Sequence, residues 1–210
     1  MASVKGLLSH VPLYIGLQRA LGADRLRYRC IEETAIKPGE TVLDVGCGPA
    51  YYFDRLPQPI TYHGFDTDAG YISWARDRWG DAASFHVGVF DEASAATLPE
   101  FDVILLLGLL HHLDDTAATE LLGLAASVLR PNGRVVSVDT CFEPEQGRIS
   151  RWMSNNDRGE HVRDAEAFVA LAGAHFDDVE GVVVRDATRI PSSHWLMHLR
   201  GQRVPAGPSV

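Results

Sequence analysis

The sequence is poor in the residues that build disulfide scaffolds, zinc sites and membrane spans. Its 210 residues include only three cysteines, Cys30, Cys47 and Cys141, which are far apart and form no CxxC pair. This spacing argues against a disulfide framework or a zinc knuckle and favours the reduced thiols of an intracellular protein. No run of 18 apolar residues occurs, and histidine, proline and arginine interrupt the mildly apolar N-terminal segment. We therefore expect a cytoplasmic protein with neither a signal peptide nor stable membrane insertion.

Positive charge is also scarce. The chain has 19 Lys and Arg against 28 Asp and Glu, for a net charge of −9. It therefore lacks the broad basic surface that binds a phosphate backbone, and we expect no nucleic-acid partner. Its hydrophobic content of 46% is ordinary for a soluble globular domain, and its length suffices for one core.

Apolar runs alternate with amphipathic segments over the first two thirds of the chain. An N-terminal helix is predicted over residues 13–36, with a break at Gly22. The strands predicted after it cover residues 41–46, 60–66, 83–89, part of 101–113 and 134–140. The helices predicted between them cover residues 50–56, 69–80 and 115–130, the last ended by "PNG". This alternation predicts right-handed crossovers and a parallel sheet covered by helices on both faces.

The pattern changes after residue 140. Residues 141–163 are longer and more polar than a crossover requires, which indicates an insertion on the substrate side. A helix over 164–173 and two strands over 178–186 and 194–200 follow, and strands in succession predict an antiparallel hairpin. We expect one α/β domain: an N-terminal helical cap (1–37), a core (38–140), this insertion, a C-terminal helix and strand pair (164–200) and a tail (201–210).

The stretch "VLDVGCGPAYY" at residues 42–52 raises the question of a ligand. A buried strand ends in Asp44, and Gly46 and Gly48 follow one residue apart. Glycines let the backbone approach a ligand where a Cβ would clash, although a tight structural turn has the same need. A dinucleotide-binding loop would have a third glycine where Tyr51 stands.

The loop resembles the nucleotide-binding motif of class I S-adenosylmethionine-dependent methyltransferases, acid-x-G-x-G-x-G, with Ala50 at the third glycine. Three further stretches, "YHGFDTDAGYISWAR", "FDVILLLGLLHHLDD" and "VLRPNGRVVSVD", are similar to later motifs of that family, in the family's order. The resemblance covers most of residues 38–140. It implies a Rossmann-like, seven-stranded, mostly parallel sheet and S-adenosyl-L-methionine as the cofactor, with S-adenosyl-L-homocysteine as the product.

The resemblance also implies a set of cofactor contacts. Asp66 would accept hydrogen bonds from the ribose hydroxyls, and a backbone carbonyl near Leu107 would receive the methionine ammonium. The family often has an acid for adenine where this chain has Val89, so backbone groups of Val89 and Phe90, or Asp91, would take that contact. An N-terminal helix often covers the cofactor. The full expected set is Asp44, Gly46, Cys47, Gly48, Asp66, Thr67, Val89, Phe90, Leu107, Tyr14 and Arg19.

Two adjacent histidines follow the fourth strand. Neighbours on a strand end point in different directions, so we expect one to pack and the other, His112, to line the methyl-transfer cleft as a base or as a wall. His111 is the second catalytic candidate, and we expect no metal site. For the acceptor we expect Arg158, His161 and Arg163 of the insertion to bind an anionic or hydroxyl-rich group. Asp157 is an alternative base.

These features predict in-line methyl transfer to a small molecule, at oxygen or nitrogen, by a monomer or homodimer. Two alternatives remain open. One is a nicotinamide-dependent oxidoreductase, against which Tyr51 and the in-strand position of Asp44 count. The other is an S-adenosylmethionine-binding protein without catalysis.

Overall fold

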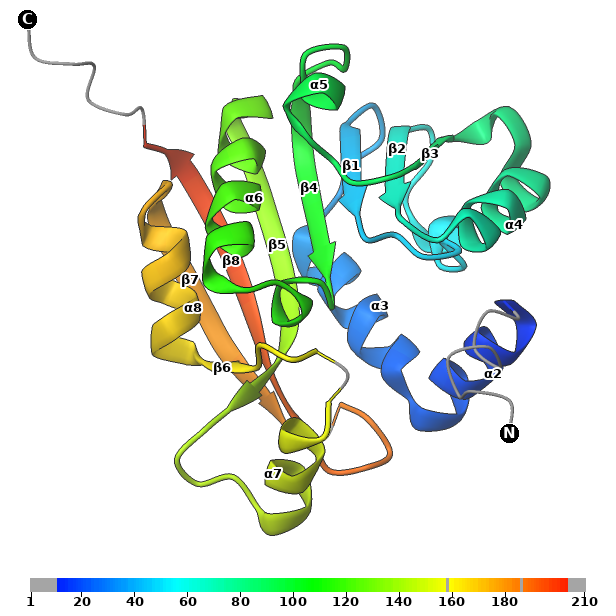
Figure 1. Ribbon diagram of the computed structural model, residues 1–210. Coiled ribbons are helices and arrows are strands. Elements are labelled where there is room, and N and C mark those ends of the chain that lie inside the picture. The colour runs from blue at the N-terminus through cyan, green and yellow to red at the C-terminus, as the bar shows by residue number, and fades with distance from the viewer. Residues whose placement is uncertain (1–10, 158, 186, 204–210) are drawn as a thin grey trace, which may run out of the picture.

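The protein has an α/β fold, in which a mixed β-sheet is flanked by helices (Figure 1). The computed structural model describes residues 11–157, 159–185 and 187–203. The strands are β1 Thr41–Val45, β2 Thr61–Asp66, β3 Ser84–Val87, β4 Phe101–Leu107, β5 Leu129–Phe142, β6 Arg163–Asp164, β7 Phe176–Arg185 and β8 Ser193–Gln202. The α-helices are α2 Val11–Leu21, α3 Ala23–Thr34, α4 Ala69–Trp79, α5 Glu92–Ala95, α6 Asp115–Val128, α7 Arg148–Asn155 and α8 Ala165–Gly173. The 3₁₀ turns are η1 Phe53–Arg55, η2 Gly80–Ala82 and η3 Leu110–His112.

The strands run in the order β3-β2-β1-β4-β5-β8-β7, and the short β6 pairs with β5 outside this path. The pairs from β3 to β5 are parallel, whereas β8 is antiparallel to both β5 and β7. The predicted seven-stranded, mostly parallel sheet with a C-terminal hairpin is therefore confirmed. The strand order reverses between β1 and β4, which in open α/β sheets is where ligands bind, beyond the carboxyl ends of the strands.

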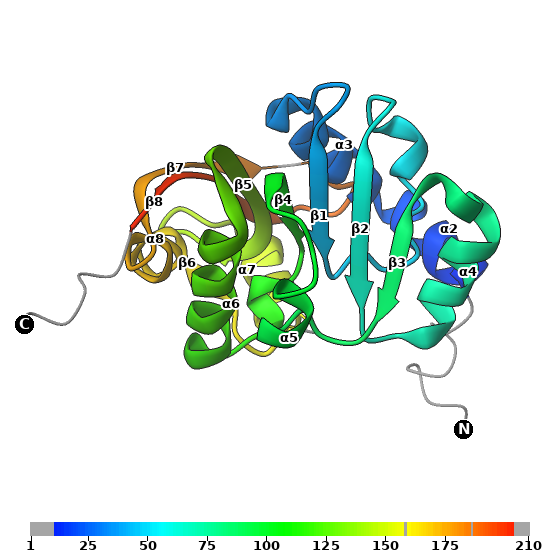
Figure 2. The ribbon, with the colours of Figure 1, turned by 90° about the horizontal axis from the view of Figure 1, so that it is seen from above.

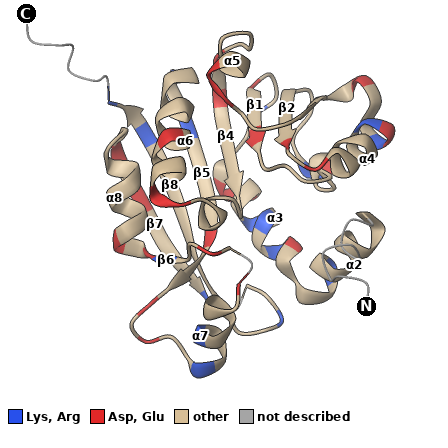
Figure 3. Cartoon of the chain, in the orientation of Figure 1, with Lys and Arg blue, Asp and Glu red and all other residues tan. Residues whose placement is uncertain are grey.

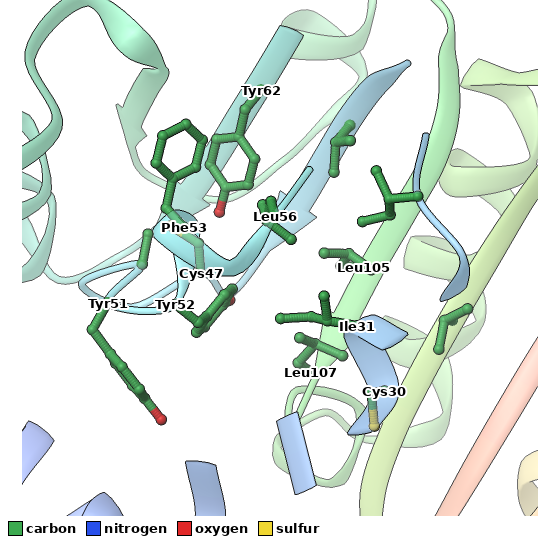
Figure 4. Packing of buried hydrophobic residues seen from close by; sticks show 14 of the residues in the cluster. Cys30, Ile31, Cys47, Tyr51, Tyr52, Phe53, Leu56, Tyr62, Leu105 and Leu107 are labelled. Atoms are coloured by element: carbon green, nitrogen blue, oxygen red, sulfur yellow. The ribbon is translucent and has the colours of Figure 1, made fainter. Parts of the chain in front are cut away.

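Helices cover both faces of the sheet, with α3 on one side and α6 and α8 on the other (Figure 2). The first face buries Ile31 of α3 against Leu105 and Leu107 of β4, together with Tyr52 and Tyr62 (Figure 4). The central strands β1 and β4 are buried almost throughout, as is β5 from Val135 to Cys141, which is expected for parallel strands covered on both sides. The outer strand β3 is largely exposed. No helix of the described residues combines the length and apolar character needed to cross a bilayer.

Two predicted elements differ from the structure. The fifth strand begins at Leu129 rather than at residue 134, so "PNG" lies within β5, where the pairing with β4 shifts register between Phe101 and Val103. Pro131, Asn132 and Gly133 fall between the paired residues Leu129 and Arg134 and form a bulge instead of ending the segment. The short helix predicted over residues 50–56 is only the 3₁₀ turn η1. The N-terminal break is as predicted, because Gly22 has a φ of 78° between α2 and α3.

Candidate active site

The glycine loop after β1 folds against the end of β2. Gly46 and Gly48 have φ values of 76° and 56°, which side chains with a Cβ rarely adopt. The backbone N–H groups of Gly46 and Cys47 both donate to the Phe65 carbonyl, at 2.8 and 3.0 Å. A Cβ on Gly46 would also lie 3.2 Å from Leu109. The loop thus requires glycine at Gly46 for both conformation and space.

Asp66 connects this loop to the next strand. It stands at the end of β2, where its Oδ2 accepts from the Gly48 N–H and its Oδ1 from the Asp68 N–H, each at 2.8 Å. Burial raises the pKa of Asp66, while these two backbone donors oppose the shift. Each carboxylate oxygen keeps a second lone pair, so the side chain can still accept from a pair of vicinal hydroxyls.

A cavity of about 1310 Å³ opens beside the loop and continues along α6. Its walls include six of the predicted site residues, namely Gly46, Asp66, Thr67, Val89, Phe90 and His112. Cys47 and Leu107 are buried rather than part of this wall. Burial raises the pKa of the Cys47 thiol well above its ordinary value, so this cysteine is an inert packing residue.

Asp44 is a fully buried carboxylate in β1. Its Oδ2 accepts hydrogen bonds from the hydroxyls of Tyr52 and Tyr62, at 2.7 and 2.6 Å. Its Oδ1 has no protein partner among the described residues. Burial raises the pKa of Asp44 to about 6, although both tyrosines oppose the shift. A buried carboxylate oxygen without a partner is costly, and a cationic group placed beside it would lower that cost.

Arg27 of α3 provides the opposite charge nearby. Its guanidinium donates to Tyr51 Oη at 2.9 Å, Gln18 Oε1 at 3.2 Å and Tyr14 Oη at 3.3 Å. All three acceptors are neutral, and no carboxylate in the described part of the chain is within ion-pair distance of this guanidinium. Figure 4 shows Tyr51 extending away from the Tyr52 and Tyr62 cluster. Arg27 is close enough to Asp44 to lower the pKa of that carboxyl.

The two predicted residues of α2 differ in position. Tyr14 contacts Arg27 and packs on Tyr71, with ring centroids 5.1 Å apart. Arg19, by contrast, is exposed. The structure therefore brings Arg27, which sequence reasoning missed, to the position expected for Arg19. No sequence motif singles out Arg27, because the rotation of α3, which packing sets, decides which of its side chains reach Tyr51.

The adjacent histidines separate as expected. His111 is buried, and its Nδ1 lies 2.9 Å from Asp139 Oδ1 while its Nε2 lies 3.3 Å from Asp157 Oδ1. Burial lowers the pKa of His111, but the hydrogen bonds to the two carboxylates outweigh it and raise this pKa to about 9. His111 is therefore an imidazolium at neutral pH. His112, with its ring centroid 4.2 Å from that of His111, lines the cavity.

Asp157 and residues 159–163 form a strap over η3. Asp157 accepts from Thr140 Oγ1 and from the Gly159 N–H, and the His161 N–H donates to the His111 carbonyl at 3.0 Å. A Cβ on Gly159 would lie 2.0 Å from His111 Cδ2, so the strap fits against this ring only with glycine there. Burial raises the pKa of Asp157, but the hydrogen bond from His111 outweighs it and lowers this pKa to about 2.

Two of the three predicted acceptor residues, His161 and Arg163, lie in this strap. Arg163 is buried, and all five of its N–H donors can be matched to protein acceptors: the carbonyls of Leu110, Leu113 and His161 and, twice, Asp115. We therefore reassign Arg163 from substrate binding to holding η3. His161 contributes its backbone to the strap. Arg158 lies outside the described residues. Asp139, which orients His111, was not identified from the sequence because 28 residues separate the two.

Comparison with known proteins identifies the family and the fold. The sequence profile of the methyltransferase domain family matches residues 16–175. The chain is 30% identical over 155 residues to phosphoethanolamine N-methyltransferase 1 of Arabidopsis thaliana, covering 71% of this chain and 31% of that protein. It is 28% identical over 114 residues to the ubiquinone biosynthesis O-methyltransferase of Aromatoleum aromaticum, covering 52% and 48%. The chain thus spans less than half of these relatives.

Solved structures share the fold. N-methyltransferase NodS from Bradyrhizobium japonicum WM9, in complex with S-adenosyl-L-homocysteine, superposes with a TM-score of 0.63 at 19% sequence identity, over 84% of this chain and 86% of that one. With the family profile matched over most of its length, the chain belongs to the methyltransferase domain family, within the class I S-adenosylmethionine-dependent methyltransferases.

Proposed function

We propose that the protein transfers the methyl group of S-adenosylmethionine to a nitrogen or oxygen of a small-molecule acceptor. The observation that carries the proposal is the pair formed by Asp44 and Arg27. Each is a buried or partly buried charge without a charged contact, and the two lie near one another beside the glycine loop. An α-amino acid end has the complementary ammonium and carboxylate, which a nicotinamide dinucleotide lacks.

The remaining residues fit the rest of the cofactor. Asp66 would accept from the ribose hydroxyls, and Val89 and Phe90 line the cavity wall where adenine contacts are expected. The Leu107 carbonyl, at the end of β4, would add an acceptor for the ammonium. When bound, the cofactor supplies an electrophilic methyl group, so the protein has to align the acceptor and exclude water.

His112 is the candidate for contact with the acceptor, because it lines the cavity while His111 is enclosed between carboxylates. As a protonated group, His111 cannot accept a proton, so we assign it to positioning η3. His112 would take a proton from an acceptor that holds one at neutral pH, such as an ammonium or a hydroxyl. The two relatives are an N-methyltransferase and an O-methyltransferase, which supports both acceptor types.

Calorimetry tests the cofactor assignment. S-adenosylmethionine should bind, and Arg27→Gln should weaken it by about tenfold or more, as for the loss of a charge-assisted hydrogen bond. 5′-Methylthioadenosine, which lacks the amino acid end, should bind both proteins equally. Arg25→Gln, an exposed arginine on the same helix, is the matched control. Saturable binding of NAD with none of S-adenosylmethionine would overturn the proposal.

Turnover separates an enzyme from a binding protein. Radiolabelled methyl transfer would be measured over a panel of primary amines, phenols and carboxylates. His112→Ala should lower kcat for the accepted class while leaving S-adenosylmethionine affinity within about twofold. Binding without transfer to any member of a broad panel would favour the non-catalytic alternative.

A further inference from the structure

Helix α7 exposes two large apolar side chains and buries two serines. Ile149 and Trp152 are 60% and 62% exposed, whereas Ser150 and Ser154 are 6% and 3% exposed. An ordinary surface helix does the reverse. The apolar pair is therefore unpartnered in the monomer, on the insertion that extends beyond the carboxyl end of β5 (Figure 1).

A polar network fixes this orientation. Gln146 Nε2 donates to Ser150 Oγ at 3.0 Å and to Ser154 Oγ at 2.8 Å. Ser154 also donates to the Cys141 carbonyl at 3.2 Å, and Ser150 Oγ lies 3.1 Å from Ser193 Oγ. Turning α7 to bury Trp152 would break these four hydrogen bonds and leave buried polar atoms without partners. The outward position of the apolar pair is thus built into the fold.

Two arginines lie beside the apolar pair. Arg148 and Arg151, one turn apart, are both exposed, and neither forms an ion pair within the described ranges of the chain. Arg151 is held by the Glu143 carbonyl at 3.0 Å, a neutral acceptor. The Glu143 carboxylate instead pairs with Arg185. Figure 3 shows the blue of Lys and Arg on α7, although the net charge of the chain is −9.

We propose that α7 docks the protein onto an anionic phospholipid surface, with Trp152 and Ile149 entering the headgroup layer and Arg148 and Arg151 contacting the lipid phosphates. Charge complementarity favours this occupant, because basic residues beside Trp and aliphatic side chains are the composition of interfacial helices. A stable protein interface needs roughly 800 Å² from each partner, more than two side chains on a two-turn helix provide. Docking of this kind needs no membrane-spanning helix.

Vesicle co-sedimentation tests the proposal without cofactor or acceptor, so its outcome is independent of the proposed function. The full chain should bind vesicles of phosphatidylcholine with about 30% phosphatidylserine and bind pure phosphatidylcholine weakly. Ile149→Ser with Trp152→Ser should lower partitioning by at least about tenfold. Arg148→Gln with Arg151→Gln should remove the preference for anionic vesicles. Val182→Ser, at a 47% exposed valine of β7, is the control and should bind as the wild type does.

A second measurement excludes misfolding. Trp152 emission should shift to shorter wavelength with anionic vesicles, and Trp152→Phe should lose the shift while keeping the wild-type unfolding temperature. Absence of vesicle binding by the wild type would overturn the proposal, as would equal binding by the serine double variant. Concentration-dependent self-association in sedimentation velocity that the serine substitutions abolish would instead assign the face to a second copy of the chain.

Discussion

The ionic contact between the strap and His111 makes the stability of this protein depend on pH in a defined way. Replacing Asp157 with Asn removes one of the two carboxylates that hold the imidazolium and keeps the size of the side chain. The other carboxylate, Asp139, remains 2.9 Å from Nδ1. The change therefore weakens the ionic contacts of His111, while Asp139 remains as its partner.

The magnitude follows from the pKa of His111. Raising it from 6.5 to about 9 corresponds to about 3 kcal/mol at 1.36 kcal/mol per pKa unit. A raised pKa stabilises the protonated folded state, so this contribution is complete below pH 6.5 and is lost as pH rises through 9. Asp157 is the longer contact, at 3.3 Å, and is 25% exposed, so we assign it the smaller share, about 1 kcal/mol.

Urea unfolding at pH 6.5 and above pH 9 measures the difference. The free energy of unfolding of Asp157→Asn should be about 1 kcal/mol below that of the wild type at pH 6.5, and the two should converge above pH 9. Glu160→Gln, an exposed carboxylate of the same strap, should show neither effect. An unchanged pH dependence in Asp157→Asn, or an NMR-titrated His111 pKa near 6.5 in the wild type, would refute the reasoning.

Three further predictions concern the cofactor site and the strap. Asp66→Ala should lower S-adenosylmethionine affinity by about tenfold or more in calorimetry, because two hydroxyl contacts are lost; wild-type affinity would break the ribose assignment. Tyr62→Phe removes a donor to the Asp44 carboxylate and should raise its pKa above about 6, so affinity should fall near neutral pH and recover as pH rises; a uniform loss at every pH would contradict this role. Gly159→Ala should lower the unfolding free energy by about 1–3 kcal/mol through the clash with His111, while Gly147→Ala, with open space around it, should not.

Local patterns were enough to predict the sheet and the glycine loop. Apolar runs that alternate with amphipathic segments predict buried parallel strands, whatever lies elsewhere in the chain. An acid followed by two glycines restricts the conformation of the next turn. The position of Asp66 beside the glycine loop could also be predicted, because parallel strands end at the same edge of a sheet and Asp66 ends β2. The start of β5 at Leu129 could not be predicted, because the pairing of Leu129 with Phe101 decides it, whereas "PNG" by itself indicates a turn.

The sequence by itself determined the fold class and the order of the motifs, because these depend on residues close together in the chain. Through the family that these motifs resemble, it also indicated the methyl donor. Only the tertiary structure decided which arginine stands beside the loop, since Arg19 and Arg27 are both on helices whose rotation is set by packing. It also decided the charge of His111, whose carboxylate partners lie 28 and 46 residues further along the chain. The outward face of α7 depends likewise on Ser193, a distant residue that pairs with the buried serine and fixes how the helix is turned.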